Sequence, residues 1–287
     1  MLWLFVQERK TPPLTKPSET VLLFVQERKT PSLTKPSEAV LLYGRVALAS
    51  SFARVRSMTD KILGVLGGMG PLASAQFMLR MTLLTPAGRD QEHVPAVLWS
   101  DPRVPARSRA AGSEDPLPWL LRGVRGLRAA GCGAIAVPCN TAHGWYEDLA
   151  AEGLPVLHIV EAAADDLRLV LPRGVVGVMA TQATLDMRLY HARLERHGWA
   201  CIEPTAEEMR ELVTPAIASV KANRVAEAYG PLAAVVQALA ARGAGAVVLG
   251  CTEIPLGIQA GPWESLRVPV VDSIDALARA SIAWARG

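Results

Sequence analysis

Cysteine is scarce in this 287-residue chain, which has four cysteines and no CxxC pair. A disulfide scaffold or a zinc site built on paired cysteines is therefore not expected, and no Cys or His pair has the spacing of zinc ligands. We expect no metal. Few cysteines and no recognisable secretory signal favour a reducing cytoplasm, where thiols stay free for chemistry.

Long apolar runs and basic clusters are also missing. No stretch of 18 apolar residues occurs, so we expect neither a membrane span nor a membrane partner. The 30 Lys and Arg residues nearly balance 27 Asp and Glu, and no basic block is interleaved with aromatic residues. Nucleic acid is therefore not an expected partner. Half of the residues are hydrophobic, which is typical of a globular chain with a sizeable core.

The N-terminal 57 residues contain a near-exact repeat. The segment Leu4–Leu22 recurs 19 residues later, at Leu23–Leu41, with two differences. It shows no sustained period of 3.6 or 2, so we expect residues 1–57 to be a non-structural extension and Met58 to be the natural start. The alternative is a targeting arm, because VALASSFARVRS (46–57) is rich in Arg and Ser and lacks acidic residues.

From Lys61 onward, short β-branched segments alternate with helical stretches rich in Ala, Leu and Arg. This alternation is typical of βαβ units with a mostly parallel sheet. The predicted strands lie at 62–67, 95–100, 134–138, 155–159, 175–180, 246–250 and 269–273.

Three segments recur in the same order at a nearly constant offset. LRAAGCGAIAVPCNT (127–141) matches LAARGAGAVVLGCTE (239–253), and the segments near Gly64 and Pro155 recur 113 and 114 residues later. We therefore predict an α/β fold of two similar lobes, each a mostly parallel sheet flanked by helices, related by pseudo-two-fold symmetry with the site in the cleft between them. The expected lobes are residues 58–160 joined by 272–287, and residues 161–271.

This duplication places one cysteine after a buried strand in each lobe. Ligands of open α/β sheets bind beyond the carboxyl ends of the strands, so Cys139 and Cys251 are expected on opposite walls of one cleft. The start of a helix is expected to lower the pKa of each thiol. Two thiols on opposite faces of a carbon can exchange a proton and invert its configuration. Cys132 and Cys201 have no cysteine counterpart, and we expect them to be structural.

Small polar residues follow both cysteines. Asn140, Thr141 and Thr252 can hold a carboxylate through N–H and hydroxyl groups. In the second lobe, Thr181 and Thr184 can either contact the same substrate or cap a helix.

Histidines near the first cysteine leave further alternatives open. His143, four residues after Cys139, can either tune the thiol or serve packing. His158 and Asp272 occupy matched positions after two strands, where they could bridge the lobes, and we assign them no chemistry.

Four segments together resemble the aspartate racemase branch of the aspartate/glutamate racemase superfamily: GGMGP (67–71), RDQEH (89–93), PCNTAH (138–143) and GCTEIP (250–255). The resemblance runs from Lys61 to the C-terminus. It implies interconversion of L- and D-aspartate without pyridoxal phosphate or another cofactor, by a homodimer whose two cysteines form the acid/base pair. Glu253 stands where glutamate racemases typically carry His, which favours aspartate over glutamate.

The resemblance also implies residues that hold the substrate. In DPRVPARSRAAG the matching arginine is Arg107, and in IASVKANR the matching lysine is Lys221. Aspartate carries two carboxylates, so a cleft that desolvates both must supply positive charge. Met69 and Gly70 of the glycine-rich turn and Glu253 complete the predicted substrate site; the glycines are expected to let that turn close over a small anion.

Other functions fit parts of this pattern. Related superfamily reactions are decarboxylation of a malonate and isomerisation of maleate, but a decarboxylase needs only one thiol. A non-catalytic amino-acid-binding protein is an alternative of another class. GVLGGMG (64–70) resembles a dinucleotide-binding turn, but it lacks the GxGxxG spacing and a following acidic strand end.

Overall fold

The computed structural model describes residues 61–287, so the repeat in residues 1–57 and Met58 lie outside the described part. The strands are β1 (Leu63–Gly67), β2 (Ala96–Ser100), β3 (Ala134–Ala136), β4 (Val156–Leu157), β5 (Gly174–Ala180), β6 (Trp199–Ile202), β7 (Ala246–Gly250) and β8 (Val270–Asp272). The α-helices are α1 (Pro71–Leu84), α2 (Leu117–Ala129), α3 (Tyr146–Ala150), α4 (Ile159–Val170), α5 (Gln182–Asp186), α6 (His191–Arg196), α7 (Ala206–Glu208), α8 (Thr214–Lys221), α9 (Tyr229–Ala241), α10 (Glu253–Gln259) and α11 (Ser273–Arg286). Short 3-10 or π-helical turns are η2 (Asp90–Glu92), η3 (Thr141–Trp145), η4 (Met209–Val213), η5 (Val225–Ala228) and η6 (Trp263–Ser265).

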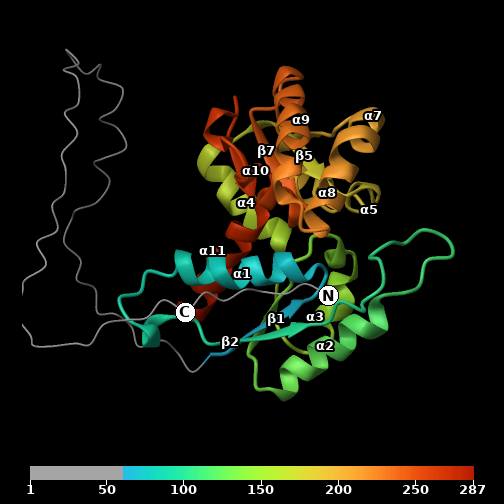
Figure 1. The fold of residues 1–287 in the computed structure, drawn as a ribbon. Coiled ribbons are helices and arrows are strands. Elements are labelled where there is room, and N and C mark those ends of the chain that lie inside the picture. The colour runs from blue at the N-terminus through green and yellow to red at the C-terminus, as the bar shows by residue number, and fades with distance from the viewer. Residues whose placement is uncertain (1–60) are drawn as a thin grey trace, which may run out of the picture. The chain divides into compact units, whose positions relative to one another are not determined.

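The described strands form two parallel sheets with the same strand order (Figure 1). The first sheet has the order β2-β1-β3-β4 and the second has the order β6-β5-β7-β8. Each strand of the first sheet therefore has the same position in its sheet as the strand numbered four higher has in the second sheet. This arrangement confirms the predicted α/β fold with two similar, helix-flanked lobes.

Burial explains which strands the sequence revealed. Every residue of β1 and β7 is buried, so these central strands read as continuous apolar segments between two helical layers. The edge strand β6 was missed, because its WACI sequence is short and only Trp199 in it is buried.

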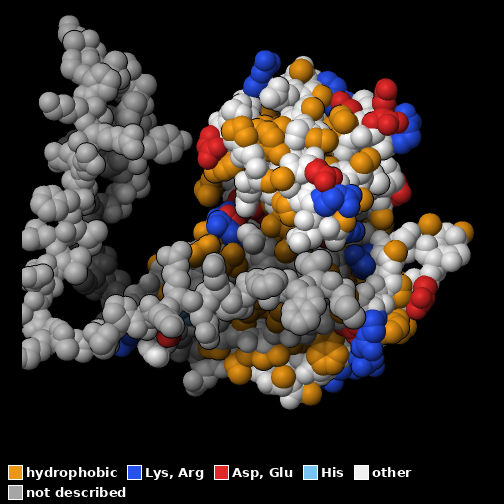
Figure 2. Space-filling model, viewed as in Figure 1, with side chains coloured by type: hydrophobic (Ala, Val, Ile, Leu, Met, Phe, Trp, Pro, Cys, Tyr) orange, Lys and Arg blue, Asp and Glu red, His pale blue; other side chains and the backbone are white. Residues whose placement is uncertain are grey.

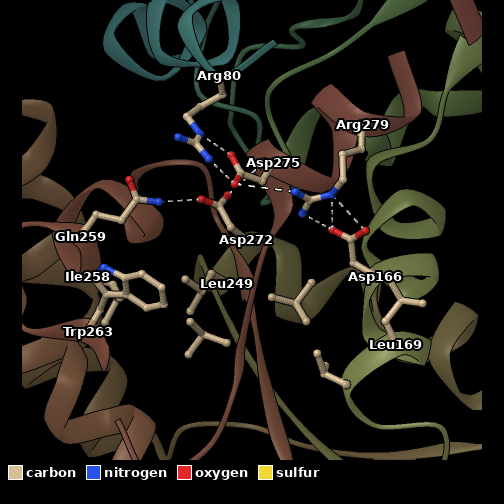
Figure 3. A pocket seen from close by; sticks show the side chains of 13 residues that line it. Arg80, Asp166, Leu169, Leu249, Ile258, Gln259, Trp263, Asp272, Asp275 and Arg279 are labelled. Carbon is tan, nitrogen blue, oxygen red and sulfur yellow. Dashed lines mark hydrogen bonds and ion pairs between the residues drawn. The ribbon is translucent and has the colours of Figure 1, made fainter. Parts of the chain in front are cut away.

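Helix α11 holds two other helices, α1 and α4, through side-chain contacts. Helix α11 packs against both α1 and α4, and α1 and α11 lie between β1 and β5 in Figure 1. Arg80 of α1 donates two hydrogen bonds to Asp275 of α11, at 2.6 and 2.7 Å, and Arg279 of α11 pairs with Asp166 of α4 (Figure 3). These ion pairs fix α11 against an element on each side.

The same ion pairs line a pocket of about 640 Å³. Figure 3 shows apolar side chains, among them Leu249, Ile258 and Trp263, below the charged groups. Because Arg80 and Arg279 are already paired with aspartates, this pocket offers an anionic substrate little uncompensated positive charge.

The matched residues His158 and Asp272 cap helices. His158 Nδ1 accepts a hydrogen bond from Val160 N–H at 3.1 Å at the start of α4. Asp272 Oδ1 accepts from Ile274 N–H and Asp275 N–H at the start of α11. The two residues therefore have the same role in both halves, because each accepts hydrogen bonds from backbone N–H groups that are otherwise unpaired at the start of a helix.

Basic and acidic side chains are interspersed over the face seen in Figure 2. Within residues 61–287, the structure contains no helix long and apolar enough to cross a membrane. The same part of the chain contains no group of three His, Cys, Asp or Glu residues placed to hold a metal ion.

Replacing Arg80 by Met is expected to lower the free energy of unfolding by about 1–3 kcal/mol, because it leaves the largely buried Asp275 carboxylate without its bidentate partner. Urea unfolding measures this change. The matched control is Arg125→Met, which breaks a bidentate pair with Glu152 whose arginine is 59% exposed, and which should cost at most about 1 kcal/mol. Equal losses in the two variants would contradict a special role for the α1–α11 pair.

Candidate active site

The two predicted thiols follow equivalent strands. Cys139 lies three residues after β3, and Cys251 follows β7 directly. β3 and β7 are third in their respective sheets, and both cysteines are buried. The parallel sheets thus deliver one thiol from each half at the carboxyl end of the corresponding strand.

Cys251 is bonded to an acidic neighbour. Its Sγ donates a hydrogen bond to Glu253 Oε2 at 3.1 Å, and the Thr252 hydroxyl also contacts this oxygen, at 3.3 Å. Burial raises the pKa of Cys251 well above its usual value, the Glu253 carboxylate raises it further, and the Lys221 ammonium opposes the rise. The expected lowering of this thiol's pKa by the helix start is therefore wrong for Cys251, since desolvation and a buried carboxylate outweigh the short helix α10.

His143 supports the backbone of Cys139. Its Nε2 accepts a hydrogen bond from Ile159 N–H at 3.2 Å, so Nδ1 carries the proton and donates to the Cys139 carbonyl at 3.0 Å. Burial lowers the pKa of His143 to about 4. The neutral ring therefore ties the Cys139 segment to the start of α4, and these bonds go to backbone groups, not to the thiol.

Five residues predicted to bind the substrate line one pocket of about 660 Å³. These are Met69, Gly70, Arg107, Lys221 and Glu253, contributed by both halves of the chain. Its other lining residues, none of which was predicted to contact the substrate, are Gly68, Pro71, Leu72, Pro102, Val220 and Asn223. Neither cysteine lines this pocket, but Cys251 borders it through Glu253.

Only one of three neighbouring arginines lines this pocket. Arg107 donates to the carbonyl oxygens of Pro105 and Met69, and its buried Nε has no hydrogen-bond partner. Arg103 instead pairs with Asp101 at 2.8 Å, and Arg109 donates to the Gly144 carbonyl at 2.6 Å. Of the three arginines, the geometry therefore singles out Arg107 as the pocket residue. The sequence singled it out only through the family resemblance.

The glycine-rich turn after β1 packs closely against the loop that begins at Asp101. Gly68 has a φ of 91°, and a Cβ there would lie 2.3 Å from the Asp101 nitrogen. Its N–H donates to the Ser74 hydroxyl at 2.9 Å, so this group is engaged within the protein, whereas the turn was expected to close over an anion. A Cβ on Gly70 would lie 3.2 Å from Glu253 Oε1, which shows how closely the turn approaches Glu253.

Three threonines from the two halves contact one another. The Thr141 hydroxyl lies 2.8 Å from that of Thr184 and 3.1 Å from that of Thr181. The Thr181 hydroxyl also accepts a hydrogen bond from Thr184 N–H and so caps α5. The capping alternative therefore holds for Thr181, and the same hydroxyl still reaches the segment that follows Cys139.

Asn140 is held by two residues that sequence reasoning missed. Its Oδ1 accepts from the Tyr190 hydroxyl at 2.6 Å, and its Nδ2 donates to Ser273 Oγ at 3.1 Å. The side chain expected to grip a carboxylate is thus engaged in a buried network. Tyr190 and Ser273 lie outside the four motifs that carry the family resemblance, and no signal in a single sequence marks either residue as functional.

The remaining cysteines lie in structural surroundings. Cys132 is buried in the apolar core of the first sheet, and Cys201 lies on the edge strand β6. Burial raises the pKa of both thiols, that of Cys201 to about 11. All four cysteines are free.

The family comparison agrees with this geometry. The sequence profile of the family described as Asp/Glu/Hydantoin racemase matches residues 66–281. The chain belongs to this racemase family. The resemblance predicted from the sequence is confirmed, and the protein is an amino-acid racemase of the Asp/Glu racemase family.

Racemases that are named for different substrates are similar to this chain. The structure of Picrophilus torridus aspartate racemase is 29% identical, with a TM-score of 0.68, and the match covers 78% of this chain and 94% of that one. The broad specificity amino-acid racemase RacX of Bacillus subtilis is 24% identical over 226 residues, 77% of this chain and 96% of RacX. Glutamate racemase of Pseudomonas entomophila is 30% identical over 204 residues, 66% of each protein.

Replacing Glu253 by Gln is expected to lower the pKa of Cys251, because it removes the negative charge that disfavours the thiolate. The rate of alkylation of Cys251 by iodoacetamide, followed by peptide mass spectrometry, should then rise at a lower pH than in the wild type. Glu264→Gln, which changes an exposed carboxylate on η6, is the control and should leave the profile in place. An unshifted profile in the Glu253 variant would show that this carboxylate does not act on the thiol.

Proposed function

We propose that this racemase interconverts L- and D-aspartate by proton exchange between Cys139 and Cys251, with glutamate as the second candidate substrate. The observation that carries the proposal is the equivalent placement of the two thiols after β3 and β7 of sheets with the same strand order. The homodimer, the cytoplasmic location and the independence of pyridoxal phosphate expected from the sequence remain part of the proposal.

Inversion requires one thiolate and one thiol at the start of each turnover. One cysteine removes the α-proton from one face of the substrate carbon, and the other donates a proton to the opposite face. The chemical roles of the two sulfurs are then exchanged, so the opposite enantiomer can be converted by the same steps in reverse. The charges around Cys251 support this use, since Glu253 favours its thiol and Lys221 favours its thiolate.

The distal carboxylate of the substrate is assigned to Arg107 and Lys221. Both line the pocket next to Glu253, and the buried Arg107 Nε lacks a partner within the protein. An unpaired buried N–H costs about 1–3 kcal/mol, so a bound carboxylate would relieve this cost. Two cations and one carboxylate leave a net positive charge in the pocket, which suits a single additional carboxylate.

The α-carboxylate is assigned to the polar residues beside the thiols. Thr141 and Thr252 directly border the cysteine segments, and Thr181 and Thr184 contact the Thr141 hydroxyl. Each hydroxyl can rotate to donate to a carboxylate, because a threonine hydroxyl has one hydrogen and accepts at two lone pairs. Holding this carboxylate would place the α-carbon close to both cysteines.

The preference for aspartate is supported by the resemblance to aspartate racemases, including the 29% identity to the Picrophilus torridus enzyme. Glu253 supports it further, since its carboxylate occupies part of the pocket beside Gly70 and favours a short side chain. The similarity to a glutamate racemase and to a broad specificity racemase makes glutamate the first substrate to compare.

Purified protein incubated with L-aspartate in deuterated water, without pyridoxal phosphate, is expected to form D-aspartate and to incorporate deuterium at the α-carbon. Cys139→Ser and Cys251→Ser should each lower the rate of inversion by roughly 10²–10⁴-fold, because each removes one of the two proton-transfer groups. NMR and chiral chromatography measure exchange and inversion.

Cys201→Ser is the matched control for these variants and should retain activity, because Cys201 lies on the distant edge strand β6. Absence of exchange and inversion with both aspartate and glutamate would instead point to another superfamily reaction or to a binding role. Full activity in either active-site variant would contradict the two-thiol mechanism.

Arg107→Leu is expected to raise KM for aspartate by roughly ten- to hundredfold, because a charge-assisted hydrogen bond to a carboxylate contributes about 1.5–3 kcal/mol. Steady-state kinetics in both directions test this. Arg103→Leu is the control from the same loop, since Arg103 pairs with Asp101 and does not line the pocket. An unchanged KM in the Arg107 variant, or an equal rise in the control, would remove Arg107 from the substrate site.

A further inference from the structure

A buried hydrogen-bond network connects the segments that carry the two thiols. Asn140 directly follows Cys139, and Leu249 lies two residues before Cys251. Tyr190, just before α6, and Ser273, the first residue of α11, are almost completely buried between them. Neither Tyr190 nor Ser273 lines the substrate pocket.

The direction of each hydrogen bond in this network follows from the available hydrogens. Ser273 Oγ donates its only hydrogen to the Leu249 carbonyl at 2.8 Å, so it must accept from Asn140 Nδ2 at 3.1 Å. The Oδ1 of Asn140 therefore faces Tyr190, whose hydroxyl must donate, at 2.6 Å. This chain of donors fixes the orientation of the Asn140 amide.

Tyr190 also contacts the second cysteine segment. A Cβ built on Gly250 would lie 2.7 Å from Cε2 of the Tyr190 ring, so the ring rests on the backbone directly before Cys251. Burial raises the pKa of Tyr190 far above its usual range, so the phenol stays protonated and remains a donor. One side chain thus meets the Cys251 segment with its ring and the Cys139 segment with its hydroxyl.

We propose that Tyr190 is a positioning residue that, through Asn140 and together with Ser273, fixes the separation and mutual orientation of Cys139 and Cys251. This inference rests on the proposed two-thiol racemisation. The two thiols come from different sheets, so the pairing within each sheet does not by itself set the distance between them. A displacement of about 1 Å in a reacting group can cost roughly a hundredfold in rate.

The test removes the hydroxyl and keeps the ring. Tyr190→Phe is expected to lower kcat for aspartate racemisation by roughly ten- to hundredfold. KM should change little, because the pocket residues Arg107 and Lys221 are untouched. The control Tyr229→Phe deletes a hydroxyl that donates to the Pro262 carbonyl at 3.0 Å, away from both cysteines, and should retain the wild-type kcat.

A double-mutant cycle separates positioning from general destabilisation. Ser273→Ala removes the other partner of Asn140, so the double variant should be little worse than the poorer single variant, since both changes release the same amide. Rates are compared per folded molecule, with near-UV circular dichroism reporting the folded fraction. Wild-type kcat in Tyr190→Phe, a loss confined to KM, or fully additive losses in the double variant would overturn the proposal.

Failure of this inference differs from failure of the proposed function. If the wild-type protein inverts aspartate or glutamate and Tyr190→Phe does so equally fast, only the positioning role is overturned. If the wild-type protein inverts neither amino acid, the two-thiol function is overturned, and the positioning role falls with it.

Discussion

Parallel pairing of the central strands is the constraint on which the site depends. β1 pairs with β3 and β5 pairs with β7, each in parallel register, so the carboxyl ends of neighbouring strands lie at the same edge of their sheet. The glycine-rich turn after β1 and the thiol segment after β3 therefore belong to one edge. The threonine loop after β5 and Cys251 after β7 belong to the equivalent edge of the second sheet. The same arrangement in both sheets places a similar set of groups in each half, and the Thr141, Thr181 and Thr184 hydroxyls of the two sets contact one another.

The pocket of that centre is lined by two cations and one carboxylate. Glu253 brings a buried carboxylate to within hydrogen-bond distance of the Cys251 thiol, while Lys221 and Arg107 line the same pocket. In a desolvated site such charges interact more strongly than they would in water. A dicarboxylic amino acid would add negative charge beside the cations and an ammonium group beside the acid. The proposed substrate therefore matches the distribution of charge as well as its sum.

Helix α11 links this centre to the rest of the fold. Its first residue, Ser273, belongs to the hydrogen-bond network with Asn140 and Tyr190. Its later residues Asp275 and Arg279 pair with Arg80 of α1 and Asp166 of α4. Ser273 also donates a hydrogen bond to the Leu249 carbonyl, two residues before Cys251. One helix therefore carries both the ion pairs of the helix junction and a member of the hydrogen-bond network beside the cysteines.

The sequence by itself determined the repeated βαβ order and the positions of Cys139 and Cys251 after buried strands, because buried parallel strands leave continuous apolar segments and a duplication leaves a nearly constant offset. It also indicated Arg107 and Lys221, through motifs that resemble a family. It did not indicate β6, whose exposed edge leaves a weak apolar pattern. The raised pKa of Cys251 and the network of Tyr190, Asn140 and Ser273 were decided only by the tertiary structure. Desolvation and hydrogen bonds between residues 50 and 133 positions apart depend on three-dimensional proximity, which local sequence patterns do not encode.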